Sequence, residues 1–234
     1  MQITKKIYRK ILVIPDLHAP WIDWKAVKYV KAWHDKHKPD LVIQLGDITD
    51  QKIWSRWQSD PDDFSPSQEF KKAAKDMNKL HEMFPKMIIL SGNHDVRVKA
   101  RAIEAGIPAE MFKDVNEVFD KKGWKWWPRD KRLIVNTQRG KILFIHGDEM
   151  GGTVAQKSRA LGMSVVQGHT HKMSLTYTQT PTNHFFGCEA GHLLDVNSKA
   201  ARYSQANPMG CSSGFVIIKY GLVMPITVDK KGRV

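Results

Sequence analysis

The sequence has few cysteines and no long apolar run. Its 234 residues include two cysteines, Cys188 and Cys211, fewer than a disulfide framework would use, so we expect both to be reduced thiols. No apolar run approaches the ~20 residues that cross a bilayer. The run Ile11–Ile14, which follows a basic start, is shorter than the ~7–15-residue apolar core of a signal peptide. These absences argue against disulfide-stapled and membrane-spanning classes, and we expect a cytoplasmic protein.

Acidic residues are scarce relative to basic ones. The chain has 24 Asp and Glu against 37 Lys and Arg, which gives a formal net charge of +13 and a pI of about 9.7. Such a charge favours polyanionic partners, nucleic acid first among them, through steering and counterion release. A basic surface without such a partner is an equally open interpretation. The length and the average composition, with 41% hydrophobic residues, predict a single domain over residues 1–234.

The two halves of the chain have different patterns. In the first half, apolar runs at 10–15, 40–45 and 87–90 alternate with amphipathic segments at 23–38 and 66–83, which predicts parallel strands joined by helices. The second half is rich in short β-branched runs, which predicts further strands. The other expected elements are helices at 96–104, 115–121 and 153–161, strands at 124–127, 132–136, 141–145, 164–166, 174–178, 184–186, 214–219 and 222–227, hairpin turns at Gly140 and Gly221, an irregular insert at 51–67 that we expect to act as a flap, and a loop at 195–213.

Potential metal ligands follow five of these apolar runs. Because the carboxyl ends of parallel strands meet at one edge of an α/β sheet, we expect these side chains to converge. Any one segment alone also fits an ordinary strand-end turn with a capped carboxylate. Mixed imidazole, carboxylate and amide ligands suit ions such as Mn, Fe, Zn or Co, whereas structural zinc sites are usually built from thiolates. The five sets are Asp16 with His18, Asp47 with Asp50, Asn93 to Asp95, His146 with Asp148, and His169 with His171.

Taken in order, the motifs Asp-x-His, Gly-Asp-x-x-Asp, Gly-Asn-His-Asp, His-Gly-Asp and Gly-His-Thr-His form a highly specific series over residues 16–171. The series resembles the calcineurin-like metallophosphoesterase superfamily. The resemblance implies an α/β (α+β) fold, a four-layer α/β/β/α sandwich with a dimetal site at the strand carboxyl ends. It also implies phosphoester hydrolysis by a hydroxide that two divalent cations about 3.5–4 Å apart activate. We expect Mn, with Fe, Zn, Co and Ni as alternatives.

The resemblance also implies roles for individual residues. Asp47 would bridge the two metals, and no protein nucleophile is required. His94 would be the catalytic imidazole, oriented by Asp50 rather than by Asp95, which we expect to brace the loop. Arg97 would contact a phosphate oxygen, although a surface helix arginine is an equally open interpretation. The metal ligands would be Asp16, His18, Asp47 and His171 for one ion, and Asp47, Asn93, His146 and His169 for the other.

The motifs also narrow the class of phosphoester. Gln51 and Lys52 stand where Ser/Thr phosphatases continue the second motif with Arg-Gly, which argues against a protein phosphatase. The paired His169 and His171 resemble the phosphodiesterase and exonuclease branches. With the +13 charge, these features predict a Mn-dependent phosphodiesterase or nuclease that acts on DNA or RNA. The alternative is a small-molecule phosphatase or cyclic-nucleotide phosphodiesterase. A catalytically inactive binding scaffold is disfavoured because every expected ligand position is filled.

A basic, tryptophan-rich segment occupies residues 121–132. Six Lys and Arg residues are interleaved with Trp124, Trp126 and Trp127. This mixture suits nucleic acid, because cations contact phosphates and indoles stack on unpaired bases. The same residues fit a hairpin whose tryptophans pack in the core, and both interpretations stay open. His192 lies in no motif, and we expect it to be an ordinary structural residue.

Overall fold

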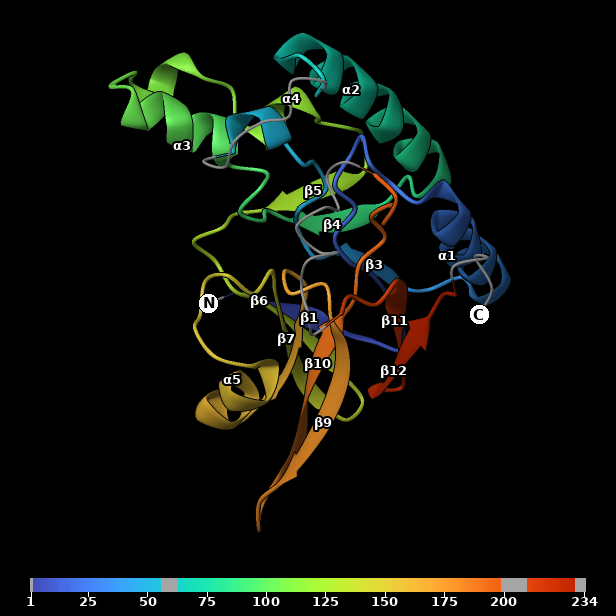
Figure 1. The fold of residues 1–234 in the computed structure, drawn as a ribbon. Coiled ribbons are helices and arrows are strands. Elements are labelled where there is room, and N and C mark those ends of the chain that lie inside the picture. Colours follow the sequence, from blue (N-terminus) through green and yellow to red (C-terminus); the bar gives the residue numbers. More distant parts are fainter. Residues whose placement is uncertain (1, 56–62, 199–209, 230–234) are drawn as a thin grey trace.

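The structure is a computed structural model that describes residues 2–55, 63–198 and 210–229. Within these ranges, two six-stranded sheets pack face to face, and helices cover the outer face of each (Figure 1). This arrangement confirms the predicted four-layer α/β/β/α sandwich. Residues 56–62 of the expected insert and 199–209 of the expected loop lie outside the described residues, so the flap stays a prediction.

The first sheet contains the three predicted strands of the N-terminal half. These three strands are mainly apolar because both faces of the sheet are buried. On the first of them, Leu12 and Ile14 pack towards the helices, whereas Ile11 and Val13 pack against the second sheet. In spatial order the strands are β12 (Leu222–Thr227), β11 (Gly214–Lys219), β2 (Lys10–Ile14), β3 (Leu41–Gln44), β4 (Met87–Leu90) and β5 (Trp124–Trp127).

The second sheet differs from the sequence-based expectation at two strands. β1 was not expected, because its lysine-rich sequence shows no clear alternation, and its partner β6 is distant in the chain. β10 was expected at 184–186 but continues to Ala190. Its full length was not predicted, because Gly187 and Glu189 interrupt the apolar pattern of this buried strand. In spatial order the strands are β1 (Gln2–Tyr8), β6 (Leu133–Thr137), β7 (Gly140–Ile145), β8 (Ser164–Gln167), β10 (His184–Ala190) and β9 (Met173–Gln179).

The predicted helices are present, and three of them form the outer layers. α1 and α2 cover the first sheet, and α5 covers the second (Figure 1). Asp23 caps α1 by accepting hydrogen bonds from the backbone N–H groups of Lys25 and Ala26. α4 ends at Val118 rather than at residue 121, because the chain turns there into β5. The helices are α1 (Trp24–His37), α2 (Pro66–Met83), α3 (Arg97–Glu104), α4 (Val115–Val118) and α5 (Val154–Leu161), with 3-10 turns η1 (Lys52–Trp54) and η2 (Ala109–Met111).

The tryptophan-rich segment forms the edge of the first sheet. β5 pairs in parallel with β4, so the hairpin part of the core interpretation is wrong. Trp124 and Trp127 are buried in the core, and Trp126 packs partly buried against the same core. Their packing matches the core interpretation of these tryptophans, and it leaves Trp124 and Trp127 unable to stack on the bases of a nucleic acid.

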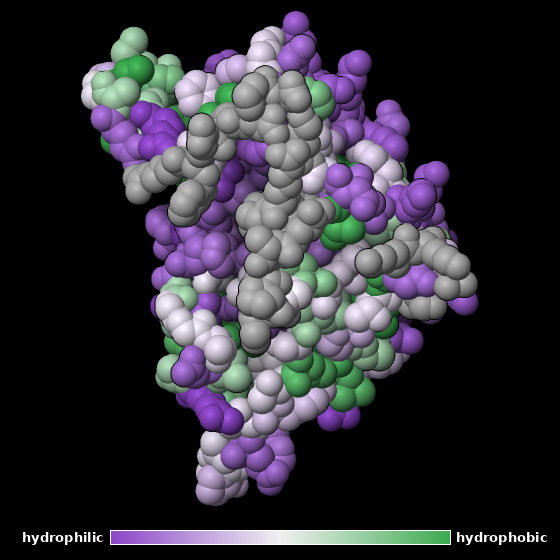
Figure 2. Space-filling model, viewed as in Figure 1, coloured by the Kyte–Doolittle hydropathy of each residue, from purple (hydrophilic) through white to green (hydrophobic). Residues whose placement is uncertain are grey.

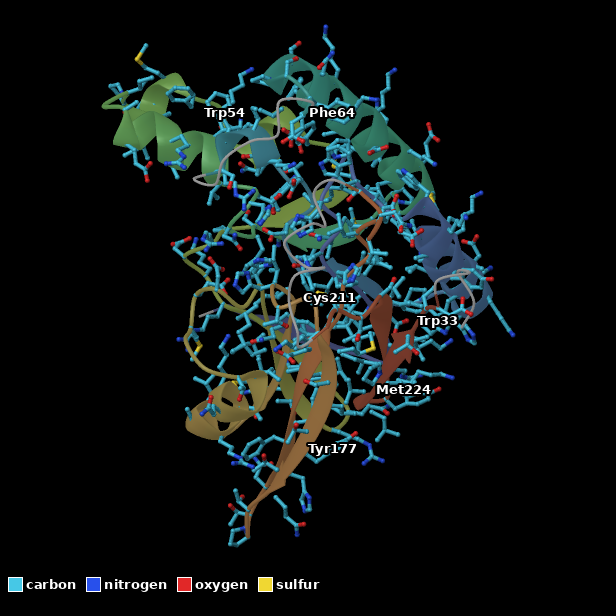
Figure 3. The ribbon with its side chains drawn as sticks, in the orientation of Figure 1. Trp33, Trp54, Phe64, Tyr177, Cys211 and Met224 are labelled. Atoms are coloured by element: carbon cyan, nitrogen blue, oxygen red, sulfur yellow. The ribbon has the colours of Figure 1, made fainter. Side chains whose placement is uncertain are left out.

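The structure bears on two features that the sequence analysis did not expect, a membrane-spanning helix and a disulfide. Across the described ranges, no helix combines the length and the hydropathy needed to cross a bilayer. Cys188 is buried between the two sheets, whereas Cys211 lies close to the ends of β10 and β11 in Figure 3. No disulfide joins Cys188 to Cys211 in the structure.

Candidate metal centre

Five loops converge at one edge of the two sheets. β2, β3 and β4 are parallel neighbours, as are β7 and β8, so the potential ligands after these strands come together. Four of these potential ligands have left-handed backbone conformations. Non-glycine residues seldom adopt such conformations, and those that do are concentrated at functional sites. The φ angles are 52° at His18, 50° at Asp47, 68° at His169 and 57° at His171.

One set of donors lies where β2 and β8 end, and it consists of Asp16, His18 and His171. Nε2 of His171 is 3.2 Å from Oδ2 of Asp16 and 2.9 Å from Nε2 of His18. Nε2 of His18 lies 4.0 Å from the same Asp16 oxygen. The backbone N–H of His169 donates to the Asp16 carboxylate at 3.0 Å and fixes its direction. These three buried side chains could hold one cation, and we refer to them as the Asp16 set.

A second set lies where β3, β4, β7 and β8 end, and it consists of Asp47, Asn93, His146 and His169. Nε2 of His146 is 3.2 Å from Oδ2 of Asp47 and 3.0 Å from Oδ1 of Asn93. Nδ1 of His169 is 2.9 Å from the same Asn93 oxygen. Imidazole, carboxylate and amide donors therefore converge on one point, and this Asp47 set could hold a second cation.

The Asp47 carboxylate lies between the two sets. Its Oδ2 is 3.2 Å from His146 in its own set and 3.9 Å from Nε2 of His18 in the other. Burial alone would raise the pKa of Asp47, but the imidazoles of His146 and His94 outweigh burial and hold this pKa well below its ordinary value. Asp47 thus stays charged while fully buried, in the position of a ligand shared by two cations.

The hydrogen bonds of two histidines fix which nitrogen is left to bind a cation. Nδ1 of His18 donates to Asp50 at 2.8 Å, and Nδ1 of His146 donates to the carbonyl oxygen of Leu45 at 3.0 Å. In a neutral imidazole the other nitrogen, Nε2, then carries a lone pair. That lone pair faces Nε2 of His171 in the first case and Oδ1 of Asn93 in the second. An Nε2 lone pair is the part of a neutral imidazole that binds a metal, so the orientation of these two histidines fits divalent metals.

The charge of the site also fits divalent metals. Burial acts to lower the pKa of His146, but the Asp47 carboxylate raises it to about 10. Burial likewise acts against protonation of His171, and Asp16 raises its pKa to about 9. The carboxylates of Asp16 and Asp47 therefore create a strongly cation-attracting pocket in which protons take the place that metal ions would fill.

Glycines let the ligand loops approach one another. A Cβ at Gly92 would lie 2.1 Å from Oδ1 of Asp47, and a Cβ at Gly168 would lie 2.2 Å from Oδ1 of Asp16. At Gly46, where φ is +99°, a Cβ would lie 2.7 Å from the backbone nitrogen of Gly92. Only glycine fits these three positions beside the carboxylates, which explains the glycines next to the ligands in the motifs.

His94 borders the Asp47 set and is held by Asp50. Nδ1 of His94 donates to Oδ1 of Asp50 at 2.8 Å, and Nε2 lies 3.8 Å from Oδ2 of Asp47. Burial lowers the pKa of His94, but Asp47 and Asp50 outweigh burial and raise this pKa above its usual value. The guanidinium of Arg97 donates to Nε2 of His94 at 2.7 Å, a contact that fits only the neutral imidazole. Protonation of Nε2 therefore requires Arg97 to move away.

Asp95 contacts the backbone of the ligand loops instead of His94. Its carboxylate accepts hydrogen bonds from the backbone N–H groups of Gly92 and Thr49, both at 2.9 Å, and from the Thr49 hydroxyl at 2.8 Å. Burial and the nearby charge of Asp47 raise the pKa of Asp95 to about 6. Asp95 thus ties the loop after β4 to the loop after β3.

The sequence reasoning missed one buried histidine beside the site. The ring centroid of His192 lies 5.1 Å from that of His171, and a backbone bridge joins His192 to Asp16. The signal was present, because Gly191 and His192 follow a strand as in the other motifs. It was overlooked because β10 was expected to end at Phe186 rather than at Ala190.

Two donor sets that share one carboxylate match the arrangement of a two-metal hydrolase, in which a phosphoryl group would lie against both ions. The chain belongs to the calcineurin-like phosphoesterase family, whose family model matches residues 9–173. The protein is therefore a phosphoester hydrolase of a family that uses divalent metals.

The chain is also similar to two phage proteins and to a solved structure along almost its whole length. It is 27% identical over 237 residues to the Gene 54 protein of Mycobacterium phage D29 and 26% identical over 242 residues to that of Mycobacterium phage L5; each match covers 90% of this chain and 88% of the phage protein. YfcE, a phosphoesterase from E. coli, matches with a TM-score of 0.53 and 15% identity, covering 93% of this chain and 92% of YfcE. The likeness to YfcE shows a shared fold.

Proposed function

We propose that this protein is a Mn-dependent phosphodiesterase that cleaves nucleic acid. When bound, two divalent ions would polarise the phosphoryl oxygens and activate a water for in-line attack. Nitrogen and oxygen donors without thiolates support Mn as the metal, with Fe, Zn, Co and Ni as alternatives. The residues assigned to the ions are Asp16, His18 and His171 for one, Asn93, His146 and His169 for the other, and Asp47 for both.

His94 is assigned to proton transfer to the departing oxygen of the ester. Because Nδ1 is occupied by Asp50, Nε2 is the nitrogen that can exchange a proton with substrate. Arg97 is assigned to donate hydrogen bonds to a phosphoryl oxygen of the substrate. A charged phosphoryl oxygen is a stronger acceptor for a guanidinium than a neutral imidazole is. Bound substrate would therefore draw Arg97 from His94 and leave Nε2 able to carry the proton.

The observation that supports nucleic acid is a group of arginines around the donor sets. Arg97 contacts His94, and Arg101 lies one helical turn further along α3, where it donates to the backbone oxygen of Trp54. Arg129 donates to the backbone oxygen of Ser91, next to the loop that carries Asn93. Arg129 also pairs with Asp148, and Arg101 with Glu104, so a phosphate would have to compete with these carboxylates. Figure 2 shows a mainly hydrophilic surface on this face below the α3 region. Cations on both sides of the site suit a chain of phosphates better than a single phosphate.

The nucleic-acid proposal predicts Mn-dependent cleavage of DNA or RNA and binding that weakens steeply with salt. The slope of log affinity against log salt is about −0.7 per phosphate contact for single strands and about −0.9 for duplex DNA. Replacing Arg101 with Gln should make this slope shallower by about one unit. Arg159→Gln, on the exposed face of α5 at the far sheet, is the matched control and should leave the slope unchanged.

Filter-binding and cleavage assays across a salt series measure both quantities. Hydrolysis of a small phosphodiester, without cleavage of DNA or RNA in any strand structure or with any of the metals, would contradict the nucleic-acid proposal. The phosphoesterase assignment would stand.

A cavity beside the site supports a second candidate, a small-molecule phosphatase or cyclic-nucleotide phosphodiesterase. Its volume is about 160 Å³, below the ~300–1,000 Å³ of sites for drug-sized ligands, so it fits only a small ligand. Thr49, Gln51 and Asp95 line it from the ligand loops, and Ile53 and Phe70 are among its apolar walls. No predicted metal ligand is among its lining residues, which is why nucleic acid is preferred. A panel of mononucleotides and cyclic nucleotides beside DNA and RNA distinguishes the two candidates.

A further inference from the structure

Three short segments run side by side next to the Asp16 set. Backbone bridges join Asp16 to His192 and His192 to Ser213. Paired residues on neighbouring extended segments point to the same face. Because the Asp16 side chain points to its donor set, His192 and Ser213 point to that side as well. The 5.1 Å between the ring centroids of His192 and His171 agrees with this direction.

His192 has a fixed proton position that excludes it as a metal ligand. The backbone N–H of Leu194 donates to Nδ1 of His192 at 3.1 Å. Nδ1 therefore carries the lone pair, and Nε2 carries the proton. A protonated nitrogen cannot bind a metal, so His192 presents an N–H donor beside the site rather than a further ligand.

This donor has no acceptor in the part of the chain that the structure describes. Nε2 of His192 and Oγ of Ser213 are both buried without a hydrogen-bond partner there. His192 is only 1% exposed. The indole N–H of Trp21, shortly after Asp16 in the chain, is also buried and unpartnered there. Buried polar groups nearly always have a partner, so donors left without one beside a metal-binding set indicate an acceptor that arrives from outside the chain.

We propose that Nε2–H of His192 and the hydroxyl of Ser213 form a subsite that donates hydrogen bonds to a phosphoryl oxygen of the ester held at the two donor sets. The inference rests on the proposed function, because the ester must lie against the Asp16 set. A phosphoryl oxygen is a charged acceptor with no proton to donate, which matches two donors that have no acceptor of their own. His192 and Ser213 would thus bind substrate from loops near the C-terminus, whereas His94 lies in the N-terminal half of the chain.

The subsite is tested by inorganic phosphate binding to protein loaded with Zn²⁺, which is free of paramagnetism. In ¹⁵N-histidine NMR spectra of the wild-type chain, phosphate should shift the Nε2–H signal of His192. His192→Phe keeps a ring and removes the donor, so calorimetry should show about 10- to 100-fold weaker phosphate binding. Ser213→Ala should weaken it to a smaller extent. His184→Phe, which replaces an exposed histidine on β10, is the control and should bind phosphate as wild type does.

A His192→Phe variant that binds phosphate like wild type, or an Nε2–H signal that phosphate leaves in place, would overturn the subsite even in an active enzyme. The NMR measurement uses the wild-type chain, so it decides the question even where a variant does not fold. A wild-type protein that hydrolyses no phosphoester yet shows the His192 shift would contradict the proposed function and support phosphate binding at the subsite.

Discussion

Replacing Asp47 with Asn is expected to lower phosphoesterase activity by more than about 100-fold and to reduce the bound metal below two ions per chain. Loss of a residue that only supports a ligand typically costs ~10–100-fold, and Asp47 is assigned as a ligand to both ions. Asn keeps the size of the side chain and can still accept from the backbone N–H of His94, which Asp47 binds at 2.8 Å. The variant therefore removes charge with little change of shape. Metal analysis and steady-state kinetics measure the two effects.

Asp40→Asn is the matched control for this experiment. Asp40 lies just before β3, at the opposite end from Asp47, and its carboxylate likewise accepts backbone N–H groups, from Arg9 and Lys10. This variant should keep two metals and full activity. An Asp47→Asn protein that holds two metals and turns over at the wild-type rate would show that Asp47 is no bridging ligand.

Replacing His94 with Asn is expected to lower kcat by about 10²- to 10⁴-fold while two metals stay bound, because His94 is assigned to proton transfer rather than to metal binding. The loss should depend on the leaving group. An aryl ester whose phenol leaves readily as an anion needs little protonation, so its loss should be much smaller than that of an alkyl ester. Parallel kinetics on the two esters, with metal analysis of the variant, measure the effect.

His184→Asn, at the exposed start of β10, is the control and should leave kcat for both esters unchanged. Loss of metal from His94→Asn would overturn the assignment to proton transfer, since it would place His94 among the ligands. An equal loss with both esters would instead assign His94 to phosphate binding.

Much of the fold could be predicted from the sequence because the apolar runs are short and cleanly bounded. The strand at Met87–Leu90 and the helix at Pro66–Met83 occur where they were predicted, since a buried parallel strand and an amphipathic helix have distinct periodicities. β1 could not be predicted, because its stability comes from pairing with β6, more than a hundred residues away. β5 was misjudged as part of a hairpin, because a strand's direction depends on a neighbour that its own sequence does not reveal.

The sequence predicted which side chains the structure brings together, but it did not predict their detailed arrangement. The motifs show that His18 and His171 follow strands, whereas their left-handed conformations and the 2.9 Å between their Nε2 atoms arise from packing of the two sheets. His192 is a residue beside the donor sets that the sequence did not link to the site. A Gly-His pair after a strand was visible, but its proximity to Asp16 depends on the unexpected length of β10.

The central claim, hydrolysis of phosphoesters at a two-metal centre, is tested most directly by titrating metal-free protein with Mn²⁺ while following hydrolysis of bis(p-nitrophenyl) phosphate. The two donor sets predict that activity is low at one equivalent per chain and reaches its plateau at two. Full activity at one equivalent would contradict the shared role of Asp47. Two bound equivalents without hydrolysis of this or any other phosphoester would show a binding scaffold rather than an enzyme.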